Sequence, residues 1–401
     1  MILAAVVLAA ALLAGGIFTG IELARNRLLS TAAPTGRTPN SALTPQSAAA
    51  GAPGPATPLT PGCADVNAAL ASMSIRDKLA QLLMVGVTGA ADARAVVTNQ
   101  HVGGIFIGSW TDLSMFTDGS LTNIAGSAGP LRLAVSVDEE GGRVQRLSPL
   151  IGAAPSARVL AQTQTPDEVY QLALDRGRTM HDLGITVDFA PVVDVTDAPP
   201  YTVIGDRSFS ADPAVVTAYA GAYARGLREA GVLPVLKHFP GHGRASGDSH
   251  AGPVVTPPLD ELQNIDLVPY RSLVAQAPVG VMIGHMQVPG LSGDDPASLS
   301  RAAVDLLRNG TRYGGPPFVG PVFTDALSMG AITDRYGVAD AVLKALQGGA
   351  DTALWVTTTE VPAVLDRLQS AVGAGELSIG SVDASVRRMA VAKDATSRCG
   401  R

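Results

Sequence analysis

The amino-acid sequence predicts an α/β fold, in which a single (β/α)8 barrel of the TIM type makes up most of the chain. Eight short apolar runs, each about the length of a buried strand, alternate with longer amphipathic stretches typical of helices. Polar residues able to carry chemistry follow four of these runs, and functional sites of such barrels gather where the strands end. A doubly wound open sheet is the alternative architecture.

The first 30 residues do not fit this pattern, and we expect them to precede the barrel. Residues 2–18 are apolar and rich in Ala, Leu and Val, which indicates a signal peptide or a membrane anchor. Residues 13–16 resemble a lipoprotein box, but Gly16 stands where the lipidated cysteine would be, so lipidation there is chemically excluded. We therefore predict export, with cleavage and anchoring both left open.

Residues 31–62 are rich in Pro, Ala, Thr and Ser, and Arg37 is their only charged residue. Such a segment cannot build a core, so a disordered linker is expected. The folded domain is then predicted to span residues 63–401. The chain's two cysteines, Cys63 and Cys399, bracket it. They are candidates for a disulfide in an oxidising compartment, the alternative being two unrelated thiols.

The eight predicted strands alternate with predicted helices along this domain. In chain order the strands are 82–87, 104–107, 133–137, 186–189, 232–236, 279–283, 321–323 and 351–355. Three of the helix-like segments between them are 166–183, 213–230 and 338–347. Because helices separate successive strands, the strands should be parallel.

The residues directly after four predicted strands are able to do acid–base or binding chemistry. They are Asp138, the pair Lys237 and His238, His285, and Asp325. In a (β/α)8 barrel the strand ends meet at one mouth, so these side chains are expected to lie together. Any strand must end in a polar loop, which explains one or two such residues but fits four strands less well. His285 in particular could simply cap its strand.

Residues 237–250, with the sequence KHFPGHGRASGDSH, contain three of the six histidines. The glycines and the proline predict a loop, where catalytic groups are common. Asp248 precedes His250 by two positions, so a turn would let the carboxylate hold the imidazole and raise its basicity. A zinc site built from His238, His242 and either Asp248 or His250 is the competing interpretation. His238 and His242 are four positions apart but are not predicted to lie on a helix, and no cysteine is nearby. Both facts disfavour the zinc site.

The charge of the chain disfavours one class of partner, nucleic acids. The net charge is −6 and the isoelectric point is near 5.5. The chain has no basic stripe or arginine run, so a nucleic-acid partner is not expected. We expect a monomer that needs no cofactor and no metal.

At this point the residues resemble a known family. Residues 237–250 are similar to the K-H-F-P-G-H-G-x4-D-S-H signature of bacterial β-N-acetylglucosaminidases of glycoside hydrolase family 3. The similarity continues, in the same order along the chain, at residues 138–146 (DEEGGRVQR), 189–195 (FAPVVDV), 205–209 (GDRSF) and 323–329 (FTDALSM). The resemblance spans roughly residues 79–354 and implies the same barrel.

The resemblance also implies a role for individual residues. Asp325 matches the nucleophile, which forms a covalent glycosyl-enzyme, and His250 matches the acid/base with Asp248 as its partner. The positions that hold the terminal N-acetylglucosamine are matched by Asp138, Arg146, Arg207, Lys237 and His238. The roles are chemically reasonable, because an imidazole with an ordinary pKa of ~6.5 can donate a proton and later accept one near neutrality.

The expected function is that of a retaining exo-β-N-acetylglucosaminidase acting on peptidoglycan-derived fragments in the cell envelope or outside the cell. Its partner would be a small carbohydrate, with a possible membrane tether through residues 2–18. Three alternatives remain open: a β-glucosidase of the same fold, a β-N-acetylglucosaminide phosphorylase, and a wall-binding protein without catalytic activity. The sequence at Gly108-Ser109-Trp110 departs from many relatives, so the preference beyond the first sugar is left open.

Overall fold

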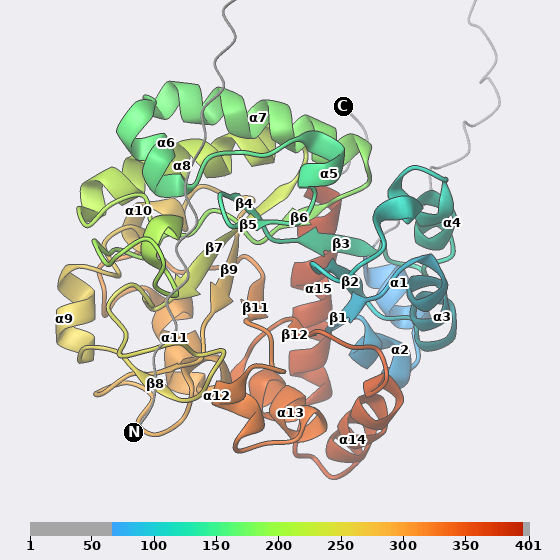
Figure 1. Cartoon of the computed structure of the whole chain (residues 1–401). Helices are drawn as coiled ribbons and strands as arrows, with labels where there is room; N and C mark the ends of the chain where they lie inside the picture. Colours follow the sequence, from blue (N-terminus) through green and yellow to red (C-terminus); the bar gives the residue numbers. More distant parts are fainter. Residues whose placement is uncertain (1–65, 396–401) are drawn as a thin grey trace, which may run out of the picture. The chain divides into compact units, whose positions relative to one another are not determined.

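The computed structural model describes residues 66–395, and in that range eight parallel strands form a barrel (Figure 1). The strands are β1 (Leu83–Val87), β2 (Gly104–Ile107), β3 (Ala134–Val137), β6 (Val187–Asp188), β7 (Leu233–Phe239), β9 (Gly280–Ile283), β11 (Val322–Thr324) and β12 (Ala353–Trp355). From β1 to β11 each strand pairs in parallel with the next, and β12 pairs with β1. A bridge between Phe323 and Thr352 joins the two ends of the sheet. The predicted barrel is confirmed, and the open sheet was wrong because the last strand returns to the first.

Strand β7 differs most from its prediction. It continues past Leu236 through Phe239, so Lys237 and His238 lie on a strand and not in a loop. Neighbouring segments keep the backbone extended, because Val193 N–H donates to Lys237 O and Gly284 N–H donates to Phe239 O. Because Pro240 and Gly241 favour a turn, the sequence predicted that the strand ends at Leu236.

Fifteen helices among the described residues surround the barrel, together with short strands in its loops. The helices are α1 (Val66–Ser72), α2 (Ile75–Ala80), α3 (Ala90–Gln100), α4 (Ser120–Gly126), α5 (Ser148–Ile151), α6 (Ala157–Thr163), α7 (Pro166–Asp182), α8 (Pro213–Glu229), α9 (Leu259–Asn264), α10 (Tyr270–Leu273), α11 (Arg301–Asn309), α12 (Gly330–Thr333), α13 (Val338–Gly348), α14 (Val361–Gly373) and α15 (Ile379–Ala395). The loop strands are β4 (Glu139–Gly141), β5 (Val144–Gln145), β8 (Val254–Val255) and β10 (Met286–Gln287). The three helices predicted from the sequence, now α7, α8 and α13, are confirmed.

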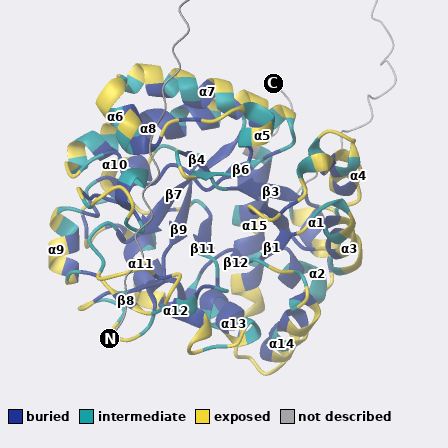
Figure 2. Cartoon of the chain, viewed as in Figure 1, coloured by how far each residue is buried: buried dark blue, intermediate teal, exposed yellow. Residues whose placement is uncertain are grey.

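Helix α7 shows how the sequence sets a helix start. Thr165 accepts a hydrogen bond from the Glu168 N–H, Glu168 accepts one from the Thr165 N–H, and Pro166 follows the cap. Helices α7 and α8 lie side by side outside the barrel (Figure 1), and their exposed faces contrast with the buried strands (Figure 2). The helices approach so closely that a Cβ at Gly226 would lie 2.6 Å from Tyr170 O.

The barrel is filled with apolar side chains, and helix α15 closes one end. The interior cluster consists of Met84, Phe106, Ala134, Val187, Phe189, Leu233, Val235, Met282, Phe323 and Leu354, together with Met389 and Ala392 of α15. Lys393 of α15 donates to Gly103 O, directly before β2, and Arg388 donates to Asp351, before β12. Helix α15 therefore covers the end where the strands begin, and the opposite end is left for a site.

Several predictions fall outside residues 66–395. They are the apolar leader 2–18, the linker 31–62, and the cysteines Cys63 and Cys399. Of the helices that the structure does describe, none combines the length and the apolar character needed to cross a bilayer.

Candidate active site

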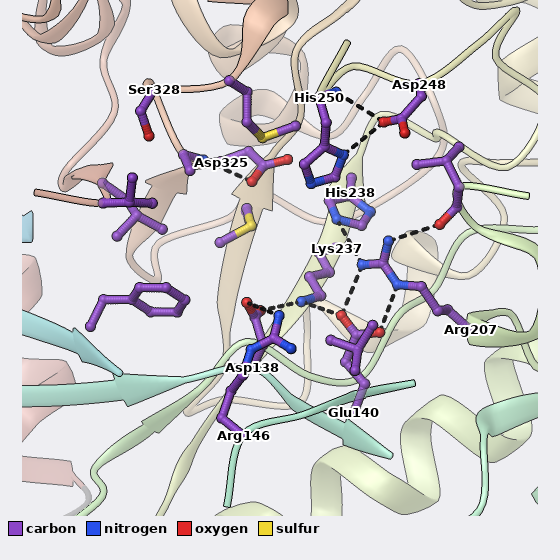
Figure 3. A pocket seen from close by; sticks show the side chains of 18 of the residues that line it. Asp138, Glu140, Arg146, Arg207, Lys237, His238, Asp248, His250, Asp325 and Ser328 are labelled. Atoms are coloured by element: carbon purple, nitrogen blue, oxygen red, sulfur yellow. Dashed lines mark hydrogen bonds and ion pairs between the residues drawn. The ribbon is translucent and has the colours of Figure 1, made fainter. Parts of the chain in front are cut away.

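All eight residues proposed for catalysis and sugar binding line one cavity of about 520 Å³ (Figure 3). They are Asp138, Arg146, Arg207, Lys237, His238, Asp248, His250 and Asp325. Apolar side chains complete the wall, among them Phe106, Trp110, Met282 and Leu354. Asp138 after β3, Lys237 and His238 at the end of β7, and Asp325 after β11 thus converge at the carboxyl end of the barrel, as the sequence predicted.

Lys237 lies at the centre of a buried network of charges. Its Nζ is 2.6 Å from Asp138 Oδ1 and 2.5 Å from Glu140 Oε1. Arg207 donates two hydrogen bonds of 2.8 Å to the Glu140 carboxylate, and Arg146 Nη2 lies 3.9 Å from Asp138 Oδ2. Figure 3 shows these five side chains on one side of the cavity.

The network keeps its members ionised. Burial would raise the pKa of Glu140, but the charges of Arg207 and Lys237 outweigh it and hold the pKa well below the usual range. Burial would lower the pKa of Lys237, but Asp138 and Glu140 raise it. A wall of fixed charges therefore faces the cavity, with donors and acceptors for sugar hydroxyls.

The β4–β5 hairpin positions two members of this wall. Its turn uses Gly141 at φ 89° and Gly142 at φ 59°, a conformation that glycine adopts without strain. Behind it, the buried Glu139 accepts hydrogen bonds from the Arg146 N–H and the Leu147 N–H. Glu139 is also 2.6 Å from Arg176 of α7. The hairpin is thereby tied to the helix layer, which fixes where Glu140 and Arg146 point.

His238 is oriented by a buried carboxylate that the sequence did not single out as a site residue. The Asp194 Oδ2 atom accepts from His238 Nδ1 at 2.7 Å. Burial alone would raise the pKa of Asp194, but the charge and hydrogen bond of His238 lower it. Because Nδ1 must carry a proton to donate, His238 presents Nε2 to Arg207 Nη2, 3.5 Å away. Asp194 thus sets the tautomer of a cavity residue.

Asp325 follows β11, and one of its oxygens accepts a 2.7 Å hydrogen bond from the Ala326 N–H. Burial would raise its pKa, but the charges of His285 and His238 and this hydrogen bond hold the pKa well below the usual range. The carboxylate is ionised at any pH near neutrality, as a nucleophile must be.

Of the two interpretations left open for His285, the structure favours a supporting role, because His285 does not line the cavity but contacts the segment that carries Asp325. The side chain is fully buried, with Nδ1 bonded to Ser298 Oγ at 2.7 Å and Nε2 to Ala326 O at 2.9 Å. Nε2 therefore donates to the backbone next to Asp325 and supports that segment from behind.

The Asp248–His250 pair lies at the cavity rim. Asp248 Oδ1 accepts from His250 Nδ1 at 2.7 Å and from the His250 N–H at 2.9 Å. The side chains are 49% and 62% exposed, so solvent reaches both. Figure 3 shows the imidazole on the same side of the cavity as Asp325, and its charge contributes to the low pKa of Asp325.

The histidines of the zinc alternative have other partners. His238 Nδ1 bonds to Asp194, and His242 Nε2 lies 3.0 Å from Ser249 Oγ. Across residues 66–395, no three His, Cys, Asp or Glu side chains are grouped in a way that could hold a metal ion.

Comparison with known proteins identifies the family. The model of the glycosyl hydrolase family 3 N terminal domain matches residues 74–392. The chain belongs to glycosyl hydrolase family 3. The resemblance drawn from the motifs is therefore confirmed, and the chain is a glycoside hydrolase.

Relatives of this family 3 chain cover between 80% and 94% of its length. "Beta-hexosaminidase LpqI" of Mycobacterium tuberculosis is 65% identical over 381 residues, which cover 94% of this chain and 98% of the relative. The crystal structure of a family 3 glycosyl hydrolase from Mycobacterium smegmatis is 74% identical with a TM-score of 0.80, covering 80% of this chain and 98% of that one. A family 3 β-N-acetylglucosaminidase from Paenibacillus sp. FPU-7 is 32% identical with a TM-score of 0.75, covering 81% and 63%.

Proposed function

We propose that the chain is a β-hexosaminidase that removes terminal, non-reducing N-acetylglucosamine from peptidoglycan-derived fragments with retention of configuration. The observation that carries the proposal is one cavity lined both by an ionised Asp325 and by a hydrogen-bonded Asp248–His250 pair. The name of the mycobacterial relative at 65% identity supports the hexosaminidase activity.

The first half of the reaction would use the two ends of this arrangement. The Asp325 carboxylate attacks the anomeric carbon while His250 donates a proton to the leaving oxygen. The glycosidic bond breaks, the alcohol leaves, and a covalent glycosyl-enzyme remains. Asp248 stabilises the protonated imidazole and holds Nδ1, so that Nε2 carries the transferred proton.

In the second half, His250 accepts a proton from water, and the resulting hydroxyl displaces Asp325 from the sugar. The enzyme returns to its starting state, and no other group is consumed. Asp325 remains the leaving carboxylate in this step, which its low pKa favours.

The charged wall of the cavity, formed by Asp138, Glu140, Arg146, Arg207 and Lys237, would hold the sugar. Asp138 can accept from two hydroxyls, while Lys237, Arg146 and Arg207 donate to hydroxyls or to the acetamido oxygen. These side chains are already fixed by one another before substrate arrives, so little ordering is required on binding.

We also propose that the enzyme is exported and acts in the cell envelope or outside the cell as a monomer. The proposal rests on the apolar residues 2–18, which could also tether the chain to a membrane. Gly16 has no thiol, so the tether would not be a lipid at that position. The folded domain is proposed to begin near residue 63, after the linker, and to need no cofactor.

The first test is release of nitrophenol from the β-N-acetylglucosaminide and the β-glucoside by the wild type and by Asp325→Ala. We expect turnover of the first substrate by the wild type, and a loss of about 10⁴-fold or more in the variant. Preference for the glucoside would support the β-glucosidase instead. Acceleration by phosphate would support a phosphorylase. A variant as active as the wild type would refute the assignment of Asp325.

A further inference from the structure

The loop formed by residues 240–253, here called the acid/base loop, carries two exposed catalytic side chains and one buried serine between them. Asp248 and His250 are about half exposed, whereas Ser249 is 1% exposed. Successive side chains point in opposite directions here, so that Asp248 and His250 face the cavity while Ser249 points into the protein. The serine is therefore placed to anchor the loop from beneath.

Ser249 Oγ lies 3.0 Å from Nε2 of His242, which is itself 2% exposed. Burial and the charge of His238 lower the pKa of His242 to about 4, so the imidazole is neutral when it bonds to the serine. The His242 N–H donates to Asp194 Oδ1 at 2.7 Å. Since the other oxygen of Asp194 holds His238, one carboxylate connects a cavity residue to the anchor of the loop.

The other side of the acid/base loop rests on helix α12, which begins shortly after Asp325. Ser249 O accepts from the Ala331 N–H at 3.1 Å, and His250 O accepts from the Gly330 N–H at 3.2 Å. A Cβ at Gly330 would lie 2.8 Å from His250 O, closer than real Cβ atoms approach. The backbone of the acid/base pair is thus docked directly against the segment that follows the nucleophile.

We propose that His242 and Ser249 are positioning residues that hold His250 at the leaving oxygen, a role that rests on the proposed function. Two exposed side chains on a glycine-containing loop would otherwise sample many positions. The His242–Ser249 hydrogen bond, together with the contacts to α12, selects the one that points into the cavity. Neither residue lines the cavity, so the effect on catalysis passes through His250.

The test compares two substrates whose leaving groups differ in whether they need a proton in order to depart. A dinitrophenolate leaves a β-N-acetylglucosaminide without protonation, whereas the sugar alcohol of an N-acetylglucosamine disaccharide requires general acid. In Ser249→Ala we expect kcat/KM for the disaccharide to fall about 30-fold, and kcat/KM for the dinitrophenyl substrate to change less than about 3-fold. A general loss of structure would reduce both values together.

A second variant perturbs the other support of the acid/base loop, which is the contact between His250 O and Gly330 of α12. Gly330→Ala leaves Ser249 and His242 intact but crowds His250 O, and we expect the same selective loss on the disaccharide. The matched control is Ser246→Ala, a serine of the same loop whose Oγ accepts only from the Val255 N–H. This variant should keep both kcat/KM values within about 2-fold of the wild type.

Equal losses on the two substrates, an unchanged disaccharide rate in Ser249→Ala, or the same selective loss in Ser246→Ala would overturn the positioning role. Failure of the proposed function is distinguishable from these results. In that case the wild type would turn over neither substrate, or His250→Ala would itself show no dependence on the leaving group.

Discussion

Among single residues, Glu140 connects Arg207 and Lys237, two of the three cations that are proposed to bind the sugar. The Glu140 side chain is 4% exposed, and its carboxylate accepts twice from Arg207 and lies 2.5 Å from Lys237 Nζ. Removing one partner of such a buried pair leaves uncompensated charge, which costs about 3–5 kcal/mol in other proteins. Glu140 therefore decides how the charged wall is arranged, without needing to touch substrate.

We expect Glu140→Gln to raise KM about 10-fold or more and to lower the melting temperature, because Lys237 and Arg207 lose their common anion. Steady-state kinetics on the nitrophenyl N-acetylglucosaminide and thermal unfolding would measure both. Glu376→Gln is the control, since Glu376 forms an exposed pair with Arg367 that contributes little. A Glu140 variant with unchanged KM would show that the wall is arranged by other contacts.

At the scale of elements, the packing of α7 on α8 depends on glycines that leave no room for a side chain. A Cβ at Gly226 would lie 2.6 Å from Tyr170 O and 2.7 Å from Leu174 N, both backbone atoms that cannot turn aside. The close approach brings α7, with Arg176, near enough to hold Glu139 behind the β4–β5 hairpin. Helix packing and the position of the charged wall of the cavity are thus linked.

We expect Gly226→Ala to destabilise the protein by about 1–3 kcal/mol, because the helices must separate. Gly373→Ala in α14 is the matched control, since nothing lies within 4 Å of its Cβ. There the change should stabilise by about 0.5–1 kcal/mol through helix propensity. Chemical denaturation of both variants gives the two free energies of unfolding, and the same sign for both would contradict the packing argument.

At the scale of the whole molecule, α15 determines which end of the barrel is open. It places Met389 and Ala392 against the interior cluster and buries Lys393, whose Nζ donates to Gly103 O at 2.8 Å. Burial lowers the pKa of Lys393 to about 7. In the unfolded chain a lysine titrates near ~10.4, so the unfolded state binds more protons at this side chain between these values.

Stability contributed through Lys393 must therefore rise with pH between about 7 and 10. We expect the free energy of unfolding of the wild type, relative to Lys393→Met, to increase by roughly 3 kcal/mol over that range. Urea unfolding of both proteins at several pH values measures the difference, and the methionine variant removes the contribution of other groups. A difference that stays flat with pH would mean that the ammonium is not desolvated in the fold.

The order of strands and helices, the Asp248–His250 pair and the place of Asp325 after its strand can all be predicted from the amino-acid pattern. These features are local: apolar periodicity marks buried elements, and a carboxylate two positions from a histidine can reach it through one turn. The extension of β7 through His238, the burial of His285 against the segment after Asp325, and the orienting roles of Asp194 and Glu140 depend instead on tertiary contacts. Each depends on which segments meet, as Lys237 meets Asp138 across 99 positions of the chain. That meeting follows from closure of the barrel, because only the closed sheet brings the ends of β3, β7 and β11 to one mouth.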